Sequence, residues 1–417
     1  MNFRGIVAVT AALTALVATG GWATGKALSG STKAAAIASS PSSAQASPTM
    51  TAAPIVPPTL SPQEALDRAK RSVVRLEPDN GQYSGSGTVV SAAGLILTNA
   101  HVAEPRAPGL AYHYALSASH DNPAYLTVSV DPPGDGPSVV KYRAKPLVAD
   151  GYLDLALVQI DALADGSPLP AGLAFSYLPV AAVDRAALGD PLTVLGYPGV
   201  AGGSQSLSVT PGGVATFLPD PQKRVKNLRW EIDTSARIAG GNSGGAAINA
   251  AGQLIGVPSA TVVGQEYSGR IRPIALAEPL LLSVADGSFP AYRTPYDVVG
   301  TGQETATPLG WSTDGTSCGS TTGTVAEGAQ RLDGAEQVAG MTPGEDVLVE
   351  LVAPDHKAAF RPQLSTWTGA ATGCLSASWS TSASSGFGAG GYEMRVYVGP
   401  QLRQVTVLPL SVQPGAG

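Results

Sequence analysis

One serine in this chain, Ser243, is surrounded by residues with almost no side chain, in the run Gly-Asn-Ser-Gly-Gly at residues 241–245. Glycine lets the backbone approach closely and adopt dihedral angles that other residues avoid. A serine that attacks a carbonyl carbon needs such access, together with backbone N–H groups directed at the oxyanion that forms. The run therefore indicates a candidate nucleophile. In a chain with 50 glycines, a glycine-rich turn without chemistry is the alternative.

The same run also fits the Gly-x-Ser-x-Gly turn of α/β-hydrolases, in which a helix follows the serine directly. Here residues 246–252 and 253–257 predict a short strand, a glycine turn and a second strand. An α/β-hydrolase also places its acid and its histidine after the serine, whereas only His356 lies beyond Ser243. Both observations argue against that class.

A histidine suited to activate the serine lies upstream. His101 follows a strand-like apolar run that begins at Leu95, so a hairpin would present it just past a buried strand. His113 and His120 lie among polar residues and proline, which predicts an exposed loop. For a lone histidine, a hydrogen-bonded core position is the simpler interpretation, and the surrounding motifs decide between the two.

The third candidate catalytic residue is an aspartate that lies in an apolar run. Asp154 lies within the apolar, strand-like residues 151–160, where an unpaired charge is costly. An imidazole N–H would remove that cost, and the carboxylate would in turn orient the histidine as a base. Asp150 and Asp161 bracket the same run, where turn or capping roles explain them more simply.

Three motifs follow one another in the order Thr-Asn-Ala-His-Val, Asp-Leu-Ala-Leu and Gly-Asn-Ser-Gly-Gly. They resemble the catalytic blocks of trypsin-like serine proteases, most of all the bacterial HtrA/DegP-like branch, over about residues 65–285. The resemblance implies an all-β fold, a double β-barrel with the site between the barrels. In this site His101 would accept the proton of Ser243, and Asp154 would hold the imidazole tautomer.

The resemblance also implies roles around the nucleophile. The backbone N–H groups of Gly241 and Ser243 match the oxyanion-hole donors of the family. Where the family usually has Asn-Pro, this chain has Ala239 and Gly240, and two successive glycines leave open an inactive resting shape of the loop. Arg237 occupies a position that contributes to the specificity pocket of the family. There it would favour an acidic or small residue before the scissile bond, unless it points to solvent.

The first residues predict export. Residues 1–25 have a basic start and an apolar segment whose length lies between that of a signal peptide and that of a membrane span. A cleaved signal peptide and a retained N-terminal membrane anchor both fit. Residues 26–60 are rich in Ala, Ser and Pro and predict a disordered linker. The protein is thus expected to be secreted or tethered to the outer face of the cytoplasmic membrane.

The remaining chain predicts two β domains. Residues 61–290 form the protease domain. It begins with a helix for which Ser61 and Glu64 predict a capping box, and it contains a Gly-Tyr-Pro-Gly hairpin at 196–199 that is interpreted as structural. Residues 291–310 predict a linker. Residues 311–417 alternate like a small C-terminal β-sandwich and do not resemble a PDZ domain.

The two cysteines, Cys318 and Cys374, both lie in the predicted sandwich, and an exported protein favours a disulfide between them. Two buried free thiols are the alternative. No four-ligand spacing for zinc occurs, because His356 is the only histidine nearby. Neither a metal nor an organic cofactor is therefore expected.

The net charge of the chain limits the classes of partner that it can bind. The formal net charge is −6 and the basic residues form only short clusters, which argues against nucleic-acid binding.

The sequence favours an extracytoplasmic serine endopeptidase that cleaves protein or peptide substrates. The alternative is an inactive or latent trypsin-like fold that serves as a binding or scaffold module. Membrane attachment would require the uncleaved N-terminus. HtrA-like relatives often form trimers, but no residue here identifies a trimer contact.

Overall fold

The structure is a computed structural model. Among its described residues, no helix is long and apolar enough to cross a membrane. The predictions for residues 1–25 and for nearly all of the 26–60 linker lie outside the described residues, as do His120 and His356. The described residues are 60–110, 113, 121–132, 136–181, 186–199, 206–220, 228–261, 269–294, 299–315, 318–319, 321–355, 359–360, 362–399 and 402–414.

The predicted first helix is present as α1 (Pro62–Ser72), with Ser61 as its N-cap. The Ser61 hydroxyl accepts the Glu64 N–H, and the Glu64 carboxylate accepts the Ser61 N–H at 2.8 Å, so the capping box is complete. The chain passes directly from this helix into the first strand, as expected. Helix α1 therefore fixes the point at which the β structure begins.

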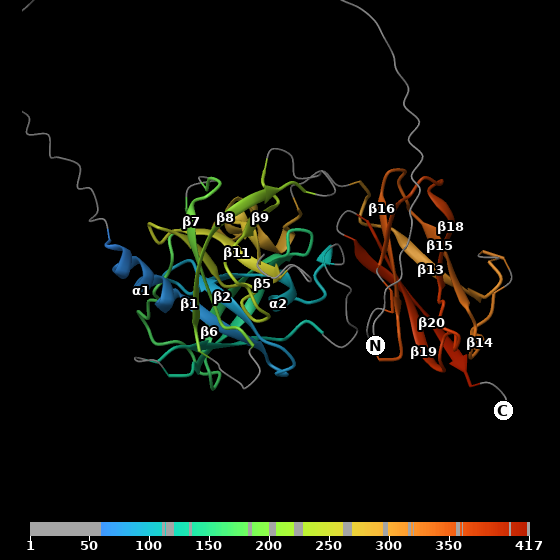
Figure 1. The fold of residues 1–417 in the computed structure, drawn as a ribbon, viewed down its shortest axis with the longest axis horizontal. Helices are drawn as coiled ribbons and strands as arrows, with labels where there is room; N and C mark the ends of the chain where they lie inside the picture. Colours follow the sequence, from blue (N-terminus) through green and yellow to red (C-terminus); the bar gives the residue numbers. More distant parts are fainter. Residues whose placement is uncertain are drawn as a thin grey trace, which may run out of the picture. The chain divides into compact units, whose positions relative to one another are not determined.

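The first six strands close into an antiparallel barrel in the order β1-β2-β3-β6-β5-β4 (Figure 1). Its short strands between glycine, proline and aspartate turns agree with the all-β prediction. The interior is apolar and includes Leu76, Ile96 and Val158. The strands are β1 (Val73–Pro78), β2 (Gly85–Val89), β3 (Leu95–Thr98), β4 (Leu126–Val130), β5 (Val139–Asp150) and β6 (Leu155–Leu163).

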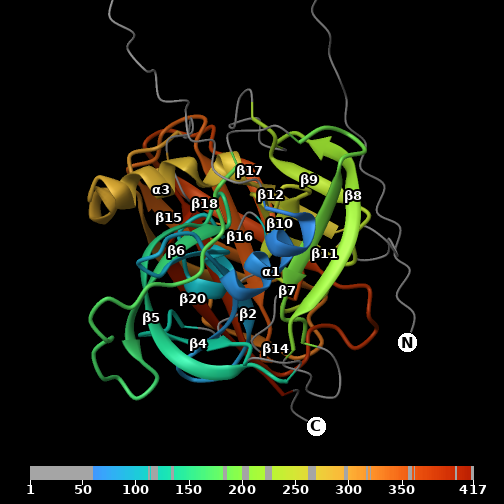
Figure 2. The ribbon, with the colours of Figure 1, turned by 90° about the vertical axis from the view of Figure 1, so that its left-hand side faces the viewer.

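The next six strands close into a second barrel in the order β10-β11-β12-β9-β8-β7. The long strand β8 pairs with β7 on one side and with β9 on the other (Figure 2). The predicted strand, glycine turn and strand after the serine are present as β10 and β11. The strands are β7 (Pro191–Gly196), β8 (Ser208–Leu218), β9 (Glu231–Thr234), β10 (Ala246–Asn249), β11 (Leu254–Thr261) and β12 (Gly269–Pro273).

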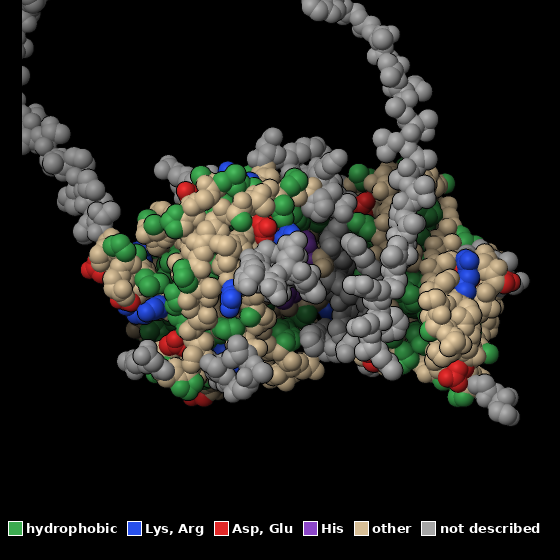
Figure 3. Space-filling view, in the orientation of Figure 1, with side chains coloured by type: hydrophobic (Ala, Val, Ile, Leu, Met, Phe, Trp, Pro, Cys, Tyr) green, Lys and Arg blue, Asp and Glu red, His purple; other side chains and the backbone are tan. Residues whose placement is uncertain are grey.

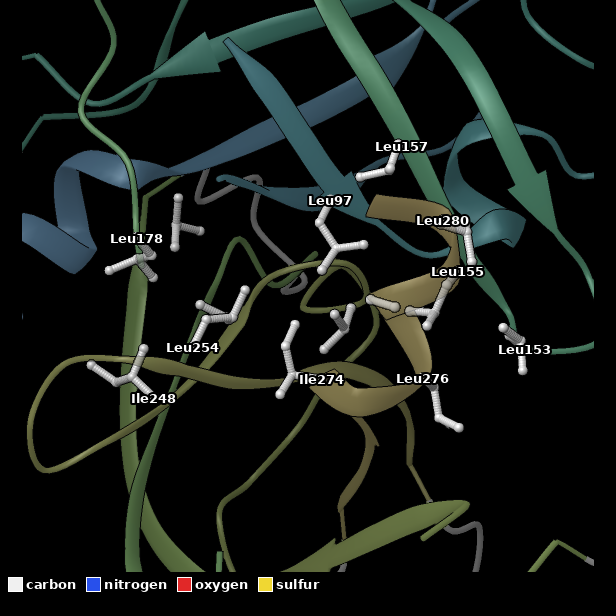
Figure 4. Close-up of a cluster of buried hydrophobic side chains, with 14 of the residues drawn as sticks. Leu97, Leu153, Leu155, Leu157, Leu178, Ile248, Leu254, Ile274, Leu276 and Leu280 are labelled. Carbon is white, nitrogen blue, oxygen red and sulfur yellow. The ribbon is translucent and has the colours of Figure 1, made fainter. Parts of the chain in front are cut away.

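A cluster of buried apolar side chains joins the two barrels (Figure 4). Leu97 and Leu157 come from the first barrel and Leu254 from the second, while η2 (Ile274–Ala277) and α3 (Glu278–Ala285) cover the cluster. Full burial of one such side chain contributes about 1.5–3 kcal/mol. The cluster therefore holds the barrels together and fixes the loops that meet between them.

The C-terminal β region consists of a three-stranded sheet, β13-β15-β18, and a five-stranded sheet, β14-β20-β19-β16-β17. Both sheets contribute to one apolar core that contains Trp311, Leu332 and Val396. After η3 (Phe289–Ala291), the strands are β13 (Thr305–Ser312), β14 (Thr324–Ala326), β15 (Arg331–Ala339), β16 (Asp346–Val352), β17 (Gln363–Thr366), β18 (Thr372–Ser380), β19 (Gly390–Val398) and β20 (Arg403–Gln413).

One predicted boundary needs correction. The linker expected over 291–310 ends earlier, because β13 begins at Thr305, which pairs with Ala339 of β15. Its threonines and glycine appear loop-like in the sequence, and the pairing partner lies too far along the chain to be recognised. The predicted disulfide is present between Cys318 and Cys374, whose Cα atoms are 6.1 Å apart.

Candidate active site

His101 lies on a short helix. Strand β3 ends at Thr98, and α2 (Ala100–Ala103) begins after Asn99, its N-cap. The strand-like run expected to lead up to His101 is therefore interrupted before it. The Asn99 carbonyl accepts the N–H groups of Val102 and Ala103 and so closes this single helical turn. The turn holds the imidazole at the end of the first barrel.

His101 and Asp154 form a close pair. The Nδ1 atom of His101 lies 3.0 and 3.1 Å from the two carboxylate oxygens, and the backbone N–H of His101 donates to Oδ1 at 3.1 Å. The carboxylate is fully buried, whereas the imidazole is 26% exposed. Because a carboxylate only accepts hydrogen bonds, this contact places the histidine proton on Nδ1 and leaves Nε2 as a base.

Asp154 lies in a turn directly before β6, and not within a strand as the sequence suggested. Its φ angle is 53°, in the left-handed region that few non-glycine residues adopt. Asn99 Nδ2 donates to its carbonyl at 2.8 Å, so the turn is held at both the backbone and the side chain. Burial alone would raise the pKa of Asp154, but the charge and hydrogen bond of His101, with smaller effects of His113 and Arg272, lower it.

The third predicted residue, Ser243, packs against the same end of the first barrel. Its carbonyl accepts the Ser86 N–H at 2.7 Å. A Cβ atom added at Gly85 would lie 2.6 Å from the side chain of Val102, the neighbour of His101, and 3.3 Å from the Ser243 carbonyl. The Ser243 hydroxyl donates to the Ser259 carbonyl at 3.3 Å. The fold therefore brings the loop of Ser243 to the helix that carries His101.

The loop before the serine is fixed by the hairpin at residues 196–199. The Gly199 N–H donates to the Gly240 carbonyl at 2.7 Å. A trans peptide is planar, so the Gly241 N–H points the opposite way from that carbonyl. Within the described part of the chain, neither the Gly241 nor the Ser243 N–H donates to a protein acceptor. Gly241 has a φ of 97°, a conformation suited to glycine.

These features agree with a comparison to known proteins. Residues 85–257 match the family model of the trypsin-like peptidase domain. These residues thus form a trypsin-like peptidase domain that is similar to HtrA/DegP-like serine proteases. Serine protease PepD of Mycobacterium tuberculosis is 30% identical over 269 residues, which are 61% of this chain and 51% of PepD. Periplasmic serine endoprotease DegP of Salmonella typhimurium is 30% identical over 177 residues, 42% of this chain and 30% of DegP.

The chain thus spans about half the length of PepD. Among solved structures, the serine endoprotease from Yersinia pestis has a TM-score of 0.40 and 24% identity, and the match covers 55% of this chain and 68% of that chain.

The prediction that His113 lies on an exposed loop is wrong. Its ring is not exposed on a loop but is packed against Trp230, with ring centroids 5.8 Å apart. Nε2 lies 2.7 Å from the Tyr152 carbonyl, and Arg272 Nη2 lies 2.9 Å from Nδ1. Because arginine only donates, Nδ1 is the acceptor and Nε2 carries the proton. Burial, with the adjacent Arg272 charge, lowers the pKa of His113 to about 3, so the ring is neutral.

The network around His113 continues across the two barrels of the trypsin-like domain. Arg272 is almost fully buried, lies over the Trp230 ring at 4.6 Å and pairs with Glu231 at 3.4 Å. The Tyr152 hydroxyl donates to Asp220 at 2.6 Å. These contacts link the turn that precedes Asp154 to the second barrel. These contacts were not predictable from the sequence, since most of the partners are far apart in the chain.

The side chain of Arg237 is exposed on the loop after β9, and its role in a specificity pocket stays a prediction. Basic and acidic side chains are few and scattered over the described surface in view, and the basic ones form no continuous patch there (Figure 3). No group of three or more His, Cys, Asp or Glu side chains suited to a metal occurs among the described residues.

Proposed function

We propose that this chain is an extracytoplasmic serine endopeptidase that hydrolyses peptide bonds of protein substrates through Ser243, His101 and Asp154. The observation that carries the proposal is the 3.0 Å contact between His101 Nδ1 and the buried Asp154 carboxylate, next to the loop of Ser243. Support also comes from relatives whose names describe serine proteases.

The chemistry follows from the proton positions. The Ser243 hydroxyl turns from the Ser259 carbonyl toward His101, and Nε2 takes its proton as Oγ adds to the substrate carbonyl carbon. Asp154 stabilises the imidazolium that forms. His101 then gives the proton to the leaving amine as the C–N bond breaks, which leaves an acyl-enzyme. Water, deprotonated by His101, hydrolyses the ester and restores Ser243.

The loop of Gly241 supplies the second requirement of this reaction. The oxygen of the tetrahedral intermediate carries a negative charge that needs preorganised donors. The N–H groups of Gly241 and Ser243 have no protein acceptor among the described residues, and the Gly240 carbonyl is turned toward Gly199 and so away from the Gly241 N–H. This geometry favours an active domain over the latent scaffold that the two glycines suggested.

An extracytoplasmic location fits two further observations. The sandwich contains a disulfide between Cys318 and Cys374, and such bonds persist mainly in oxidising compartments. The matched relatives include proteins named as periplasmic endoproteases. Secretion and membrane tethering both remain compatible with this proposal.

The test compares three forms of the full chain: wild type, Ser243→Ala and Ser283→Ala. Ser283 is a buried serine of α3 whose hydroxyl donates to the Leu280 carbonyl of its own helix, so it controls for the loss of a buried hydroxyl. A fluorophosphonate probe should label wild type and Ser283→Ala but not Ser243→Ala. The same pattern is expected for cleavage of an unfolded protein. Equal degradation by wild type and Ser243→Ala would refute the proposal, and a folded but unlabelled wild type would favour the scaffold.

A further inference from the structure

Ser86 makes more contacts with the loop of the nucleophile than any role in its own strand requires. It lies on β2 and is fully buried. Its hydroxyl donates to the Gly241 carbonyl at 2.7 Å and accepts the Tyr197 N–H at 2.8 Å. Its backbone N–H donates to the Ser243 carbonyl at 2.7 Å. One residue of the first barrel thus binds two loops of the second.

These bonds determine the shape of the oxyanion loop. Peptide planarity leaves φ and ψ as the two soft dihedral angles of a residue. The peptide before Gly241 is fixed by the bond from Gly199 to the Gly240 carbonyl, and the peptide after it by the bond from the Ser86 hydroxyl to the Gly241 carbonyl. With both flanking peptides held, the direction of the Gly241 N–H is determined.

The sequence of the loop makes this restraint necessary. Gly240 and Gly241 are adjacent, and glycine has the greatest backbone freedom of all residues. The Asn242 N–H donates to the Ala239 carbonyl at 3.0 Å and closes a turn over these two glycines. Neither has a side chain to limit it further, so bonds from neighbouring elements add the remaining restraint. The Ser86 hydroxyl is the group that reaches both this loop and the hairpin at 196–199.

The contact between Ser86 and the loop is also sterically close. A Cβ atom added at Gly244 would lie 2.0 Å from the Ser86 carbonyl and 2.1 Å from the Thr98 hydroxyl. That hydroxyl donates to the Ser86 carbonyl at 2.7 Å, so Ser86 is itself held in place. The donor and acceptor directions of its side chain are therefore fixed relative to the barrel.

We propose that Ser86 is a positioning residue for the oxyanion hole, which keeps the Gly241 N–H directed at the reacting carbonyl oxygen. This inference rests on the proposed peptidase function. Ser86 touches neither His101 nor Asp154 in any contact described above, so its loss should affect stabilisation of the oxyanion and leave the base unchanged.

The experiment compares kcat and KM of wild type, Ser86→Ala and Thr88→Val, all as full chains, with a peptide amide substrate. Thr88 lies on the same strand, is fully buried, and its hydroxyl has no hydrogen-bond partner among the described residues. Loss of an oxyanion donor costs about 100- to 1000-fold in kcat, and a misdirected donor should cost about 10- to 100-fold. We expect that fall for Ser86→Ala with KM within about two-fold, and no change for Thr88→Val.

The pH profile separates positioning from general damage. The acidic limb of kcat/KM reports the catalytic base, so it should be the same in Ser86→Ala and wild type. A shifted limb, or a kcat within two-fold of wild type, would overturn the role of Ser86. An inactive wild type would instead refute the proposed function. Should Ser86→Ala not fold, Ser86→Cys replaces the hydroxyl by a slightly larger thiol that is only a weak donor, and a wild-type kcat in that variant would overturn the inference.

Discussion

Gly240 and Gly241, which precede Ser243 by three and two residues, have unlike surroundings although they are adjacent. Gly241 has a φ of 97°, and a Cβ atom there would lie 2.4 Å from the Tyr197 carbonyl oxygen and 2.7 Å from the Gly199 nitrogen. Gly240 has no atom within 4 Å of the corresponding position and does not adopt a positive φ. Only Gly241 is therefore required by the structure.

We predict opposite outcomes for alanine at these two positions. Gly241→Ala should displace the loop and lower kcat by about 100-fold or more, the range for a lost oxyanion donor. Gly240→Ala should keep full activity and should stabilise the chain by about 0.4–1 kcal/mol, because alanine restricts the unfolded state. Steady-state kinetics and urea unfolding of both variants check this. An inactive Gly240→Ala, or an active Gly241→Ala, would contradict the assignment.

At the scale of single residues, the sequence identified the proposed catalytic residues better than the residues proposed to position them. His101, Asp154 and Ser243 were identifiable because their side chains are costly or reactive in apolar and glycine-rich surroundings. Ser86 and Gly199 were not, because a serine in a strand and a glycine in a hairpin have ordinary structural explanations. Their roles arise only when the two barrels bring residues that are far apart in sequence together.

The elements were predictable where local chemistry is strong. The capping box predicted α1, and the glycine turn at Gly252 predicted the hairpin of β10 and β11. Helix α2 was missed because one helical turn in an apolar run has no period of its own. The turn of Asp154 was missed because hydrogen bonds to Asn99 and His101, and not local preference, hold its left-handed backbone.

The disulfide joins segments on either side of a central strand. In the three-stranded sheet β15 lies between β13 and β18. Cys374 belongs to β18, and Cys318 follows β13, with a sequence separation of 56 residues. The bond therefore closes a long loop that contains β15. In the chain-entropy view, such a closure stabilises a domain mainly by restricting its unfolded state.

We predict that replacing both Cys318 and Cys374 by alanine lowers the stability of the sandwich by about 2–4 kcal/mol. The kcat should not change, because the proposed catalytic residues His101, Asp154 and Ser243 all lie outside this domain. Trp311 and Trp379 are buried in its core, with ring centroids 6.1 Å apart, so their fluorescence can follow urea unfolding. Reduction of the wild type should reproduce the loss. An unchanged midpoint in both samples would contradict the prediction.

At the scale of the whole molecule, three buried glutamates of the sandwich and one buried histidine of the barrels make opposite contributions to the pH dependence of stability. In the sandwich, burial raises the pKa of Glu336, Glu345 and Glu350 to about 7. Between pH 4.5, the ordinary pKa of a glutamate, and about pH 7, these carboxyls hold protons in the folded sandwich that the unfolded chain has lost. Their contribution to stability therefore falls as the pH rises. In the barrels, the lowered pKa of His113 acts in the opposite direction. Between about pH 3 and pH 6.5 the unfolded histidine is protonated and the folded one is neutral, so this contribution to stability rises with pH.

Glu336 offers the clearest test of the sandwich response. It lies on β15 on the same face as Leu332 and Val338, which belong to the apolar core. It is fully buried, and neither carboxylate oxygen has a hydrogen-bond partner among the described residues. The charged form that predominates above pH 7 is therefore unfavourable in the folded state.

We predict that Glu336→Gln raises the free energy of unfolding at pH 8 by about 1–3 kcal/mol, because the amide keeps the shape of the side chain without its charge. At pH 5 the effect should be small, since the wild-type carboxyl is then protonated in the folded state. Glu327→Gln, at an exposed position of the same domain, is the matched control and should show no pH-dependent gain. Urea midpoints of the full chain at both pH values measure the difference. An equal shift at pH 5 and pH 8, or a loss at pH 8, would contradict the prediction.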